Sequence, residues 1–228
     1  MKTGIILTTD NRSKAYIQKL VNNNIFLNDI ILMISNKPEK TYSNEIIKKS
    51  LECGFDISIS VIETLRKNNL KFQKFEFIDI NHTELIEYIK QTNIEYYFFT
   101  GGGILKKEIL NSGPKFVHFH PGIVPNYRGS TCFYYSIIND KNCGVTSFVM
   151  DEKLDTGDII FQKKFPKPNH EYIDEIFDPF IRSETMIDVI KNRLIENGSH
   201  IKQNIAEGET YFIIHPVLKH ISIMSCIK

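Results

Sequence analysis

Two histidines and one aspartate have the residue types and the spacing that acid–base chemistry needs. His118 and His120 stand in the run "FVHFHPG", separated by one phenylalanine. Alternate residues of a strand point to one face, so we expect both imidazoles on the same side. Asp155 follows in the run "MDEKLDTGDII". A neutral imidazole takes up a proton near neutral pH, and a neighbouring carboxylate fixes its tautomer. We therefore predict these three residues as catalytic; the alternative for Asp155 is turn capping.

A glycine-rich run precedes the histidines. Gly101, Gly102 and Gly103 in "TGGGIL" allow positive φ angles or a close approach of the backbone to a ligand. A tight turn between a strand and a helix explains the same run equally well. Ligands of open α/β sheets bind beyond the carboxyl ends of the strands. We therefore expect the glycine run, the two histidines and the turn at 150–160 to meet there.

Short apolar runs alternate with amphipathic segments over the first half of the chain. This alternation predicts an α/β fold with a doubly wound, mostly parallel sheet. The later part predicts a helix at 130–140, a strand hairpin, and a helical segment at 171–198 broken near Pro179. We expect a core over 1–165 and an extension over 166–228, packed on the core or in a dimer interface and ending in a short strand and an apolar stretch. The expected early strands are 4–9, 29–36, 75–80, 94–99 and 116–120.

Composition narrows the function classes. The 228 residues carry a formal net charge of +1, which argues against binding that relies on neutralising many nucleic-acid phosphates. The four cysteines have no metal-ligand spacing, so we expect free thiols and no metal site. The apolar run after Met1 is too short for a signal peptide, and no run reaches transmembrane length. We therefore expect a cytoplasmic protein with no membrane partner.

The runs "HFHPGIVPNYRG", "GVTSFVMDEKLDTGDII" and "GGGIL" together resemble the folate-dependent formyltransferases. That family includes glycinamide ribonucleotide transformylases, methionyl-tRNA formyltransferases and sugar N-formyltransferases, and the layout here is most similar to the last. The resemblance covers roughly residues 75–165. It implies a Rossmann-like fold, N10-formyltetrahydrofolate as the co-substrate, and no metal.

The resemblance also implies roles for individual residues. His120 matches the family's catalytic histidine and Asp155 its catalytic aspartate. His118 stands where the family usually has asparagine; an imidazole N–H can donate the same hydrogen bond to a developing oxyanion. The implied reaction is attack of a primary amine on the formyl carbon, with His120 and Asp155 moving protons. The implied folate-binding residues are Gly102, Gly103, Ile104, Leu105, Met150, Asp151, Lys153 and Leu154.

The acceptor is expected to be an amino sugar, either nucleotide-linked or a nonulosonic acid precursor. Asn11 and Arg12 stand where a helix N-terminus would hold a phosphate. Tyr127 and Arg128 are candidate contacts for the sugar and the phosphate; the alternatives are core packing for Tyr127 and loop capping for Arg128.

A short segment after the shared region and the low net charge favour an amino-sugar acceptor over methionyl-tRNA. The run "TTDNRSK" differs from the Gly-Ser-Asn loop of glycinamide ribonucleotide transformylases. Those two acceptors, hydrolysis of the formyl donor, and a non-catalytic folate- or sugar-nucleotide-binding protein stay open. A homodimer through the apolar C-terminal stretch is also expected.

Overall fold

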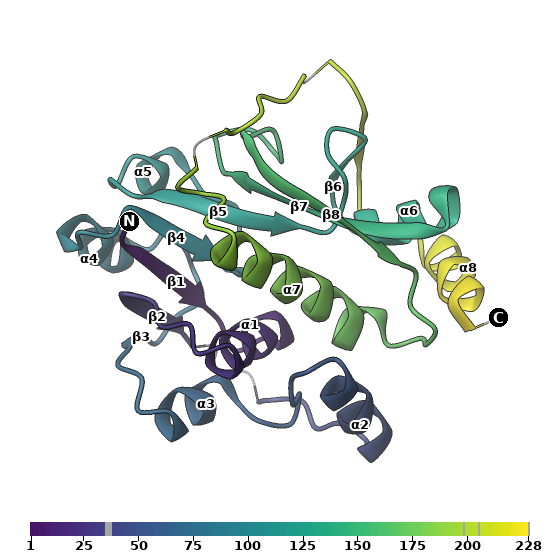
Figure 1. The fold of residues 1–228 in the computed structure, drawn as a ribbon, viewed down its shortest axis with the longest axis horizontal. Helices are drawn as coiled ribbons and strands as arrows, with labels where there is room; N and C mark the ends of the chain where they lie inside the picture. Colours follow the sequence, from purple (N-terminus) through teal and green to yellow (C-terminus); the bar gives the residue numbers. More distant parts are fainter. Residues whose placement is uncertain (35–37, 198, 205, 228) are drawn as a thin grey trace. The chain divides into compact units, whose positions relative to one another are not determined.

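The computed structural model describes residues 1–34, 38–197, 199–204 and 206–227, and Figure 1 shows its elements in chain order. The chain forms two compact units, Met1–His118 and Phe119–Lys228. The predicted division into a core over 1–165 and an extension over 166–228 stays a prediction. Residues 119–165 and the C-terminal region belong to one compact unit because strands and helices from both pack together there, as described below.

The first unit is built on parallel strands. They are β1 (Thr3–Leu7), β2 (Asp29–Met33), β3 (Gln73–Phe75), β4 (Tyr96–Phe99) and β5 (Lys115–His120), whose last two residues open the second unit. β1 pairs with β2 and β4, β2 with β3, and β4 with β5, all in parallel. Continuous apolar runs form β1, β2 and β4 because a parallel sheet is buried on both faces, whereas the edge strand β3 is polar and mostly exposed. The connecting helices are α1 (Asn11–Asn22), α2 (Asn44–Glu52), α3 (Val61–Lys67), α4 (Thr83–Gln91) and α5 (Lys107–Leu110).

Local capping explains where two of these elements begin and end. Asp10 caps α1, because its Oδ1 accepts a hydrogen bond from the Ser13 N–H at 2.8 Å. The strand predicted at 75–80 stops at Phe75. Asp79 forms a turn there by accepting the Asn81 N–H at 2.9 Å. Residues 35–36 of the predicted second strand lie outside the described residues.

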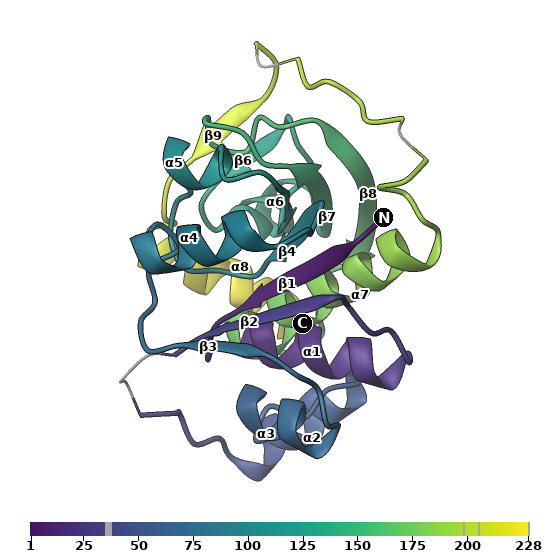
Figure 2. The same ribbon diagram turned by 90° about the vertical axis from the view of Figure 1, so that its left-hand side faces the viewer.

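The second unit combines a hairpin, helices and a small sheet. β7 (Asn142–Val149) and β8 (Ile159–Pro166) pair antiparallel, which confirms the predicted hairpin. β6 (Tyr127–Gly129) pairs in parallel with β9 (Glu209–Tyr211), and Figure 2 shows the two strands side by side. The helices are α6 (Cys132–Asp140), a short π-helix (Ile173–Phe177), α7 (Asp178–Lys191) and α8 (Pro216–Ile227).

The main sheet has the order β3-β2-β1-β4-β5-β7-β8. It is mostly parallel, with β7 and β8 as the antiparallel pair, so the predicted α/β class is confirmed. Pro179 lies in the first turn of α7, where its missing N–H costs no helical hydrogen bond. α7 ends at Lys191, short of the predicted end at Gly198, which lies outside the described residues.

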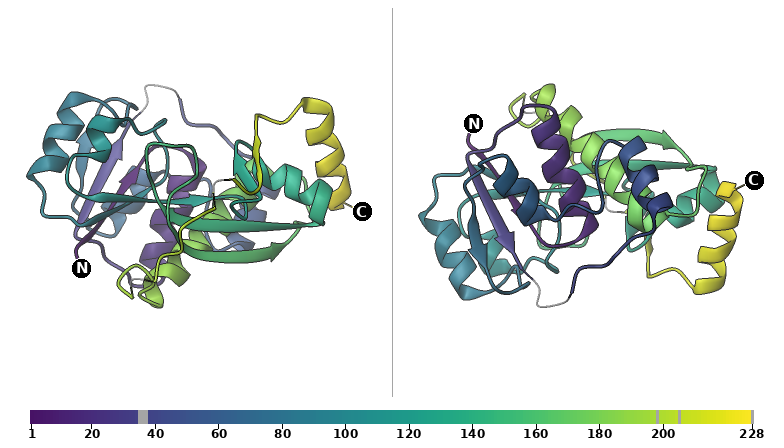
Figure 3. Two further views of the ribbon diagram at one scale, coloured as in Figure 1. Left: turned by 90° about the horizontal axis from the view of Figure 1, so that it is seen from above. Right: turned by 90° about the horizontal axis from the view of Figure 1, so that it is seen from below.

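The apolar stretch near the C-terminus is helical. It forms α8, which lies against α6 and buries Ser222 and Cys226 (Figure 3). Apolar side chains such as Val217 and Ile221 are at least half exposed on this helix. The predicted homodimer through this stretch stays a prediction. Among the described residues, no helix combines the length and hydropathy that spanning a membrane requires.

Candidate active site

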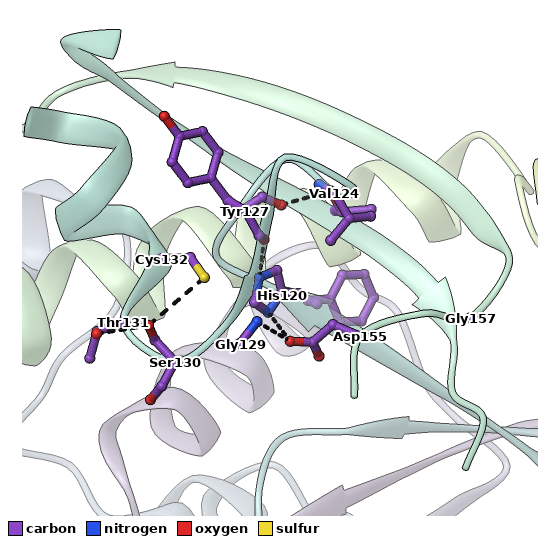
Figure 4. Close-up of polar contacts among 12 residues, drawn as sticks. His120, Val124, Tyr127, Gly129, Ser130, Thr131, Cys132, Asp155 and Gly157 are labelled. Atoms are coloured by element: carbon purple, nitrogen blue, oxygen red, sulfur yellow. Dashed lines mark hydrogen bonds and ion pairs between the residues drawn. The ribbon is translucent and has the colours of Figure 1, made fainter. Parts of the chain in front are cut away.

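His120 and Asp155 lie together in the second unit, at the end of β5 and in the turn between β7 and β8 (Figure 4). His120 Nδ1 is 3.4 Å from Asp155 Oδ2, and His120 Nε2 is 2.8 Å from the Tyr127 carbonyl oxygen. The same Asp155 oxygen accepts the Gly129 N–H at 2.8 Å. The histidine side chain is 2% exposed and the aspartate side chain 10% exposed. The carboxylate is thus the more accessible part of the pair.

The hydrogen-bond partners assign the protons on the His120 ring. A carbonyl oxygen only accepts, so His120 Nε2 is the N–H donor to Tyr127. Nδ1 then faces the Asp155 carboxylate, and a second proton on the ring would lie between the two groups. Burial lowers the pKa of His120, the Asp155 charge raises it, and the Arg182 guanidinium lowers it again. The pair is therefore poised to accept one proton from a bound molecule.

The turn that carries Asp155 has a demanding backbone. Asp155 adopts φ +53°, in the left-handed region that aspartate tolerates better than most residues. A Cβ on Gly157 would lie 1.7 Å from the Val149 carbonyl oxygen, so only glycine fits there. Asp151 accepts the Lys153 N–H at 3.1 Å and closes the first part of the turn. The run "LDTGD" therefore fixes the direction of the Asp155 carboxylate.

A buried ion pair holds the strand end that carries His120. Arg182 Nε donates to Asp178 Oδ1 at 2.6 Å, and Arg182 Nη1 donates to the Phe119 carbonyl at 2.6 Å. Arg182 and Asp178 are 4% and 3% exposed. Neither residue was predicted from the sequence. The i, i+4 spacing of an acid and an arginine inside an apolar helix was the available signal, because a buried charge needs a partner.

His118 lies on β5 two residues before His120, as predicted, so both side chains leave the strand on the same side. Within the first unit, His118 pairs in register with Phe99, and their ring centroids are 6.0 Å apart. The ring is half-buried, unlike that of His120. Its catalytic role stays a prediction.

The glycine loop lies in the first unit after β4. Gly102 and Gly103 have φ angles of 127° and 108°, which confirms the need for glycine there. Ile104 is 78% exposed and Leu105 is buried. Asn81, which the sequence analysis did not select, donates to the Ile104 carbonyl at 2.9 Å and accepts the Lys106 N–H at 2.8 Å. The loop thus presents Ile104 and its backbone from a fixed position.

The second predicted cofactor-binding segment is the hairpin turn of the second unit. Met150 is half-buried, while Asp151, Lys153 and Leu154 are exposed. Leu154 is an exposed apolar side chain directly before Asp155. An apolar residue and backbone groups beside the His120–Asp155 pair are suited to a flat, mostly apolar ligand. The role of this segment stays a prediction.

A cavity of about 400 Å³ opens in the first unit at the end of β1 and the start of α1. Asn11 lines it, as the predicted phosphate contact requires, whereas Arg12 is not among its lining residues. The Tyr42 hydroxyl donates to Asn11 Oδ1 at 2.8 Å, which leaves the Asn11 amide N–H groups as the remaining donors. Buried Lys14 contacts Glu39 at 3.2 Å in the same wall. The lining residues are Thr8, Thr9, Asp10, Asn11, Lys14, Pro38, Glu39, Lys40, Tyr42, Ile78 and Gly102.

Tyr127 and Arg128, the other two predicted substrate contacts, are buried in the second unit. The Tyr127 hydroxyl donates to Asp140 at 2.9 Å, and Arg128 Nη2 donates to the Glu207 carbonyl at 2.8 Å. These contacts favour a structural role for both side chains. Tyr127 acts on the site through its backbone carbonyl, which no side-chain pattern could have indicated.

Among the described residues, no cluster of three or more histidine, cysteine or acidic side chains has the arrangement of a metal site. The Cys132 thiol, at the start of α6, is close enough to Asp155 to be affected by its charge. Burial raises its pKa to about 12, and the Asp155 charge adds to the shift. Cys132 is therefore a neutral thiol at pH 7 and a poor nucleophile.

Comparisons with known proteins identify the family of this chain. The family described as formyl transferase matches residues 3–187. A methionyl-tRNA formyltransferase of Finegoldia magna is 28% identical over 159 residues, which are 66% of this chain and 46% of that protein. One of Clostridium tetani is 31% identical over 166 residues, 69% of this chain and 52% of that protein. The chain thus spans about half the length of these curated relatives.

Solved structures show the same fold. A sugar N-formyltransferase from Shewanella sp FDAARGOS_354 superposes with a TM-score of 0.60 at 18% identity, covering 99% of this chain and 88% of that one. An N-formyltransferase from Helicobacter canadensis, in complex with folinic acid and dTDP-3-aminofucose, gives 0.64 at 18% identity, covering 100% and 81%. At these identities the likeness concerns the fold.

Proposed function

This chain belongs to the formyl transferase family, and from that membership we propose that it moves a formyl group from N10-formyltetrahydrofolate to the primary amine of an amino sugar. The observation that carries the proposal is the His120–Asp155 pair, held between the Tyr127 carbonyl and the Gly129 N–H. A protein that only binds ligands has no need of a buried imidazole with a carboxylate directed at its unprotonated nitrogen.

The pair has a defined task in this reaction. The amine nitrogen bonds to the formyl carbon, the bond from that carbon to N10 breaks, and one proton passes from the amine to N10. Asp155 is the accessible acceptor, and His120 Nδ1 shares the proton through the 3.4 Å contact. His120 Nε2 is engaged by Tyr127, so the ring donates to the formyl oxygen only after exchanging that carbonyl for the substrate. His118 and the backbone at Gly102–Leu105 are the proposed oxyanion donor and donor-binding loop.

The amino-sugar acceptor is supported by the first-unit cavity. Asn11 amide donors, Thr8 and Thr9 hydroxyls and the Lys40 side chain line it at a helix N-terminus, a combination suited to the phosphates of a nucleotide-linked sugar. The Helicobacter canadensis neighbour was solved with such a ligand. Methionyl-tRNA is the second candidate acceptor, because the curated relatives named above are methionyl-tRNA formyltransferases.

The test follows tetrahydrofolate release while mass spectrometry reads the acceptor. Each reaction contains the protein, N10-formyltetrahydrofolate and one acceptor. The acceptors are amino-sugar nucleotides, glycinamide ribonucleotide and methionyl-tRNA. A gain of one formyl group on a sugar supports the proposal, and formylated tRNA would replace it with the second candidate. Release without an acylated acceptor means hydrolysis. Asp155→Asn should slow transfer on the order of 10³-fold, while Asp158→Asn, a change in the same turn, should leave the rate nearly unchanged.

A further inference from the structure

The segment after α7 contacts the turn that carries Asp155 and also contacts β6, which carries Tyr127 and Gly129. We call residues 201–204 and 206–214 the C-terminal strap. Its first contact is a backbone bridge in which Ile201 and Ile159 exchange two hydrogen bonds of 2.8 Å. This antiparallel register brings Gln203 opposite Gly157, beside the turn that carries Asp155. The strap then reaches β6, where β9 pairs with residues Tyr127–Gly129.

Gln203 joins the two ends of the Asp155 turn. Its Nε2 donates to the Asp155 carbonyl at 3.1 Å and to the Gly157 carbonyl at 2.6 Å. Its Oε1 is buried, and within the described residues no hydrogen-bond donor reaches it. The opposite amide orientation would place that oxygen against two carbonyl oxygens, so the nitrogen must face the turn. One side chain thus donates to the carbonyls of both Asp155 and Gly157, while the Thr156 hydroxyl between them donates to Asp151 at 2.8 Å.

The backbone of Asp155 explains why the turn needs this closure. Its φ of +53° is a sparsely populated conformation for a residue with a side chain. Such a conformation persists when the surroundings impose it. Rotation of the Asp155 backbone would swing its Oδ2 away from His120 Nδ1 and from the Gly129 N–H. The two Gln203 hydrogen bonds oppose that rotation.

We propose that Gln203 is a positioning residue that holds the Asp155 carboxylate against His120, and that the strap thereby completes the catalytic pair. The same strap supports the other partners, since β9 backs the Tyr127 carbonyl and the Gly129 N–H through its pairing with β6. The Ser130 N–H also donates to the Tyr211 carbonyl at 2.8 Å. The expected loss of kcat rests on the proposed formyl transfer, whereas the expected displacement of the Asp155 carboxylate does not.

Gln203→Met tests the proposal, because methionine has nearly the same length and volume but no donor. Lys202→Met is the matched control, since it introduces the same side chain at the exposed neighbouring position. We expect kcat to fall about 10- to 100-fold in Gln203→Met, as for other changes that misplace a catalytic group. The KM for the formyl donor should change less than about twofold, and Lys202→Met should match the unchanged protein.

A second measurement needs no substrate. NMR titration of the His120 ring, assigned by its loss in His120→Gln, reports how close the carboxylate lies. The groups that act on this ring are Asp155, Asp178, Arg182 and the Tyr127 carbonyl. Asp155 raises the pKa of His120, so its displacement in Gln203→Met should move the titration to lower pH. Unchanged signals from His170 in the same unit would show that the fold is intact.

The two measurements distinguish the positioning role of Gln203 from the proposed formyl transfer. An unshifted His120 titration, or a kcat within about twofold of the unchanged protein, overturns the positioning role. A shifted titration in a protein that formylates none of the acceptors supports the positioning role and counts against formyl transfer.

Discussion

Asp155→Asn isolates the charge of the catalytic pair from its shape. Asparagine tolerates the left-handed backbone at this position and can still accept the Gly129 N–H through Oδ1. The same amide oxygen then lies opposite His120 Nδ1, as Oδ2 does in the aspartate, and the Tyr127 carbonyl still holds the neutral ring in its orientation. What disappears is the negative charge 3.4 Å from that nitrogen. The substitution therefore removes the stabilisation of a second proton on His120 and little else.

Coulomb's law gives the size of the effect. Two unit charges at 3.4 Å interact by about 5 kcal/mol at an effective dielectric constant of ~20. If the transition state carries that proton on His120, the loss amounts to a rate decrease on the order of 10³-fold. The folded state should be retained, because the backbone and the Gly129 hydrogen bond are kept.

Single-turnover formation of tetrahydrofolate, with saturating formyl donor and acceptor, measures the rate of the chemical step. Asp158→Asn, which removes a charge from the same turn, is the control and should react at nearly the normal rate. A thermal melt of each variant checks the fold. A rate loss below about tenfold in Asp155→Asn would refute the reasoning, because a proton shared at this distance cannot be so insensitive to the charge.

Three further substitutions or conditions test the surroundings of the pair. Arg182→Met removes the guanidinium from buried Asp178 and should lower the free energy of unfolding by about 3–5 kcal/mol, measured in urea; a change below about 1 kcal/mol would contradict a role for this pair. Gly157→Ala places a Cβ against backbone and should cost roughly 1–3 kcal/mol together with most of the activity, and a normal melting temperature would count against the tight turn. Burial lowers the pKa of His120 below 6.5, so the unfolded chain binds its proton first as pH falls. The contribution of neutral His120 to the free energy of unfolding should therefore be complete above about pH 6.5 and should be lost as pH falls towards the folded pKa. His120→Gln should lose less stability over the same pH range. An equal pH dependence of the urea midpoint in both proteins would contradict this.

The proximity of His120 and Asp155 was predictable from the sequence because the neighbours of both residues are distinctive. The spacing of His118 and His120 on a strand, and the "LDTGD" run around Asp155, indicated a histidine and a carboxylate at one site. The α/β class followed from alternating apolar runs and amphipathic segments, since each periodicity reports which faces are buried.

The partners of those residues were not predictable in the same way. Periodicity says which face of an element is buried and nothing about which segment covers it. Tyr127 contributes a backbone carbonyl, and Gln203 is one polar residue in a segment without a pattern. The pairing of β6 with β9 is likewise too short and too distant in sequence to leave a signal.

The parallel pairing of β6 with β9 also bears on how the protein matures during synthesis. Tyr127 lies opposite Glu209, so the contact closes a loop that includes the whole β7–β8 hairpin and α7. When α7 has just emerged from the ribosome, His120 and Asp155 have emerged as well, but Gln203 and β9 have not. Long-range contacts of this kind form late, because the loop must close before they contribute. We therefore expect the His120–Asp155 pair to reach its final arrangement only after Gln203 and β9 have emerged.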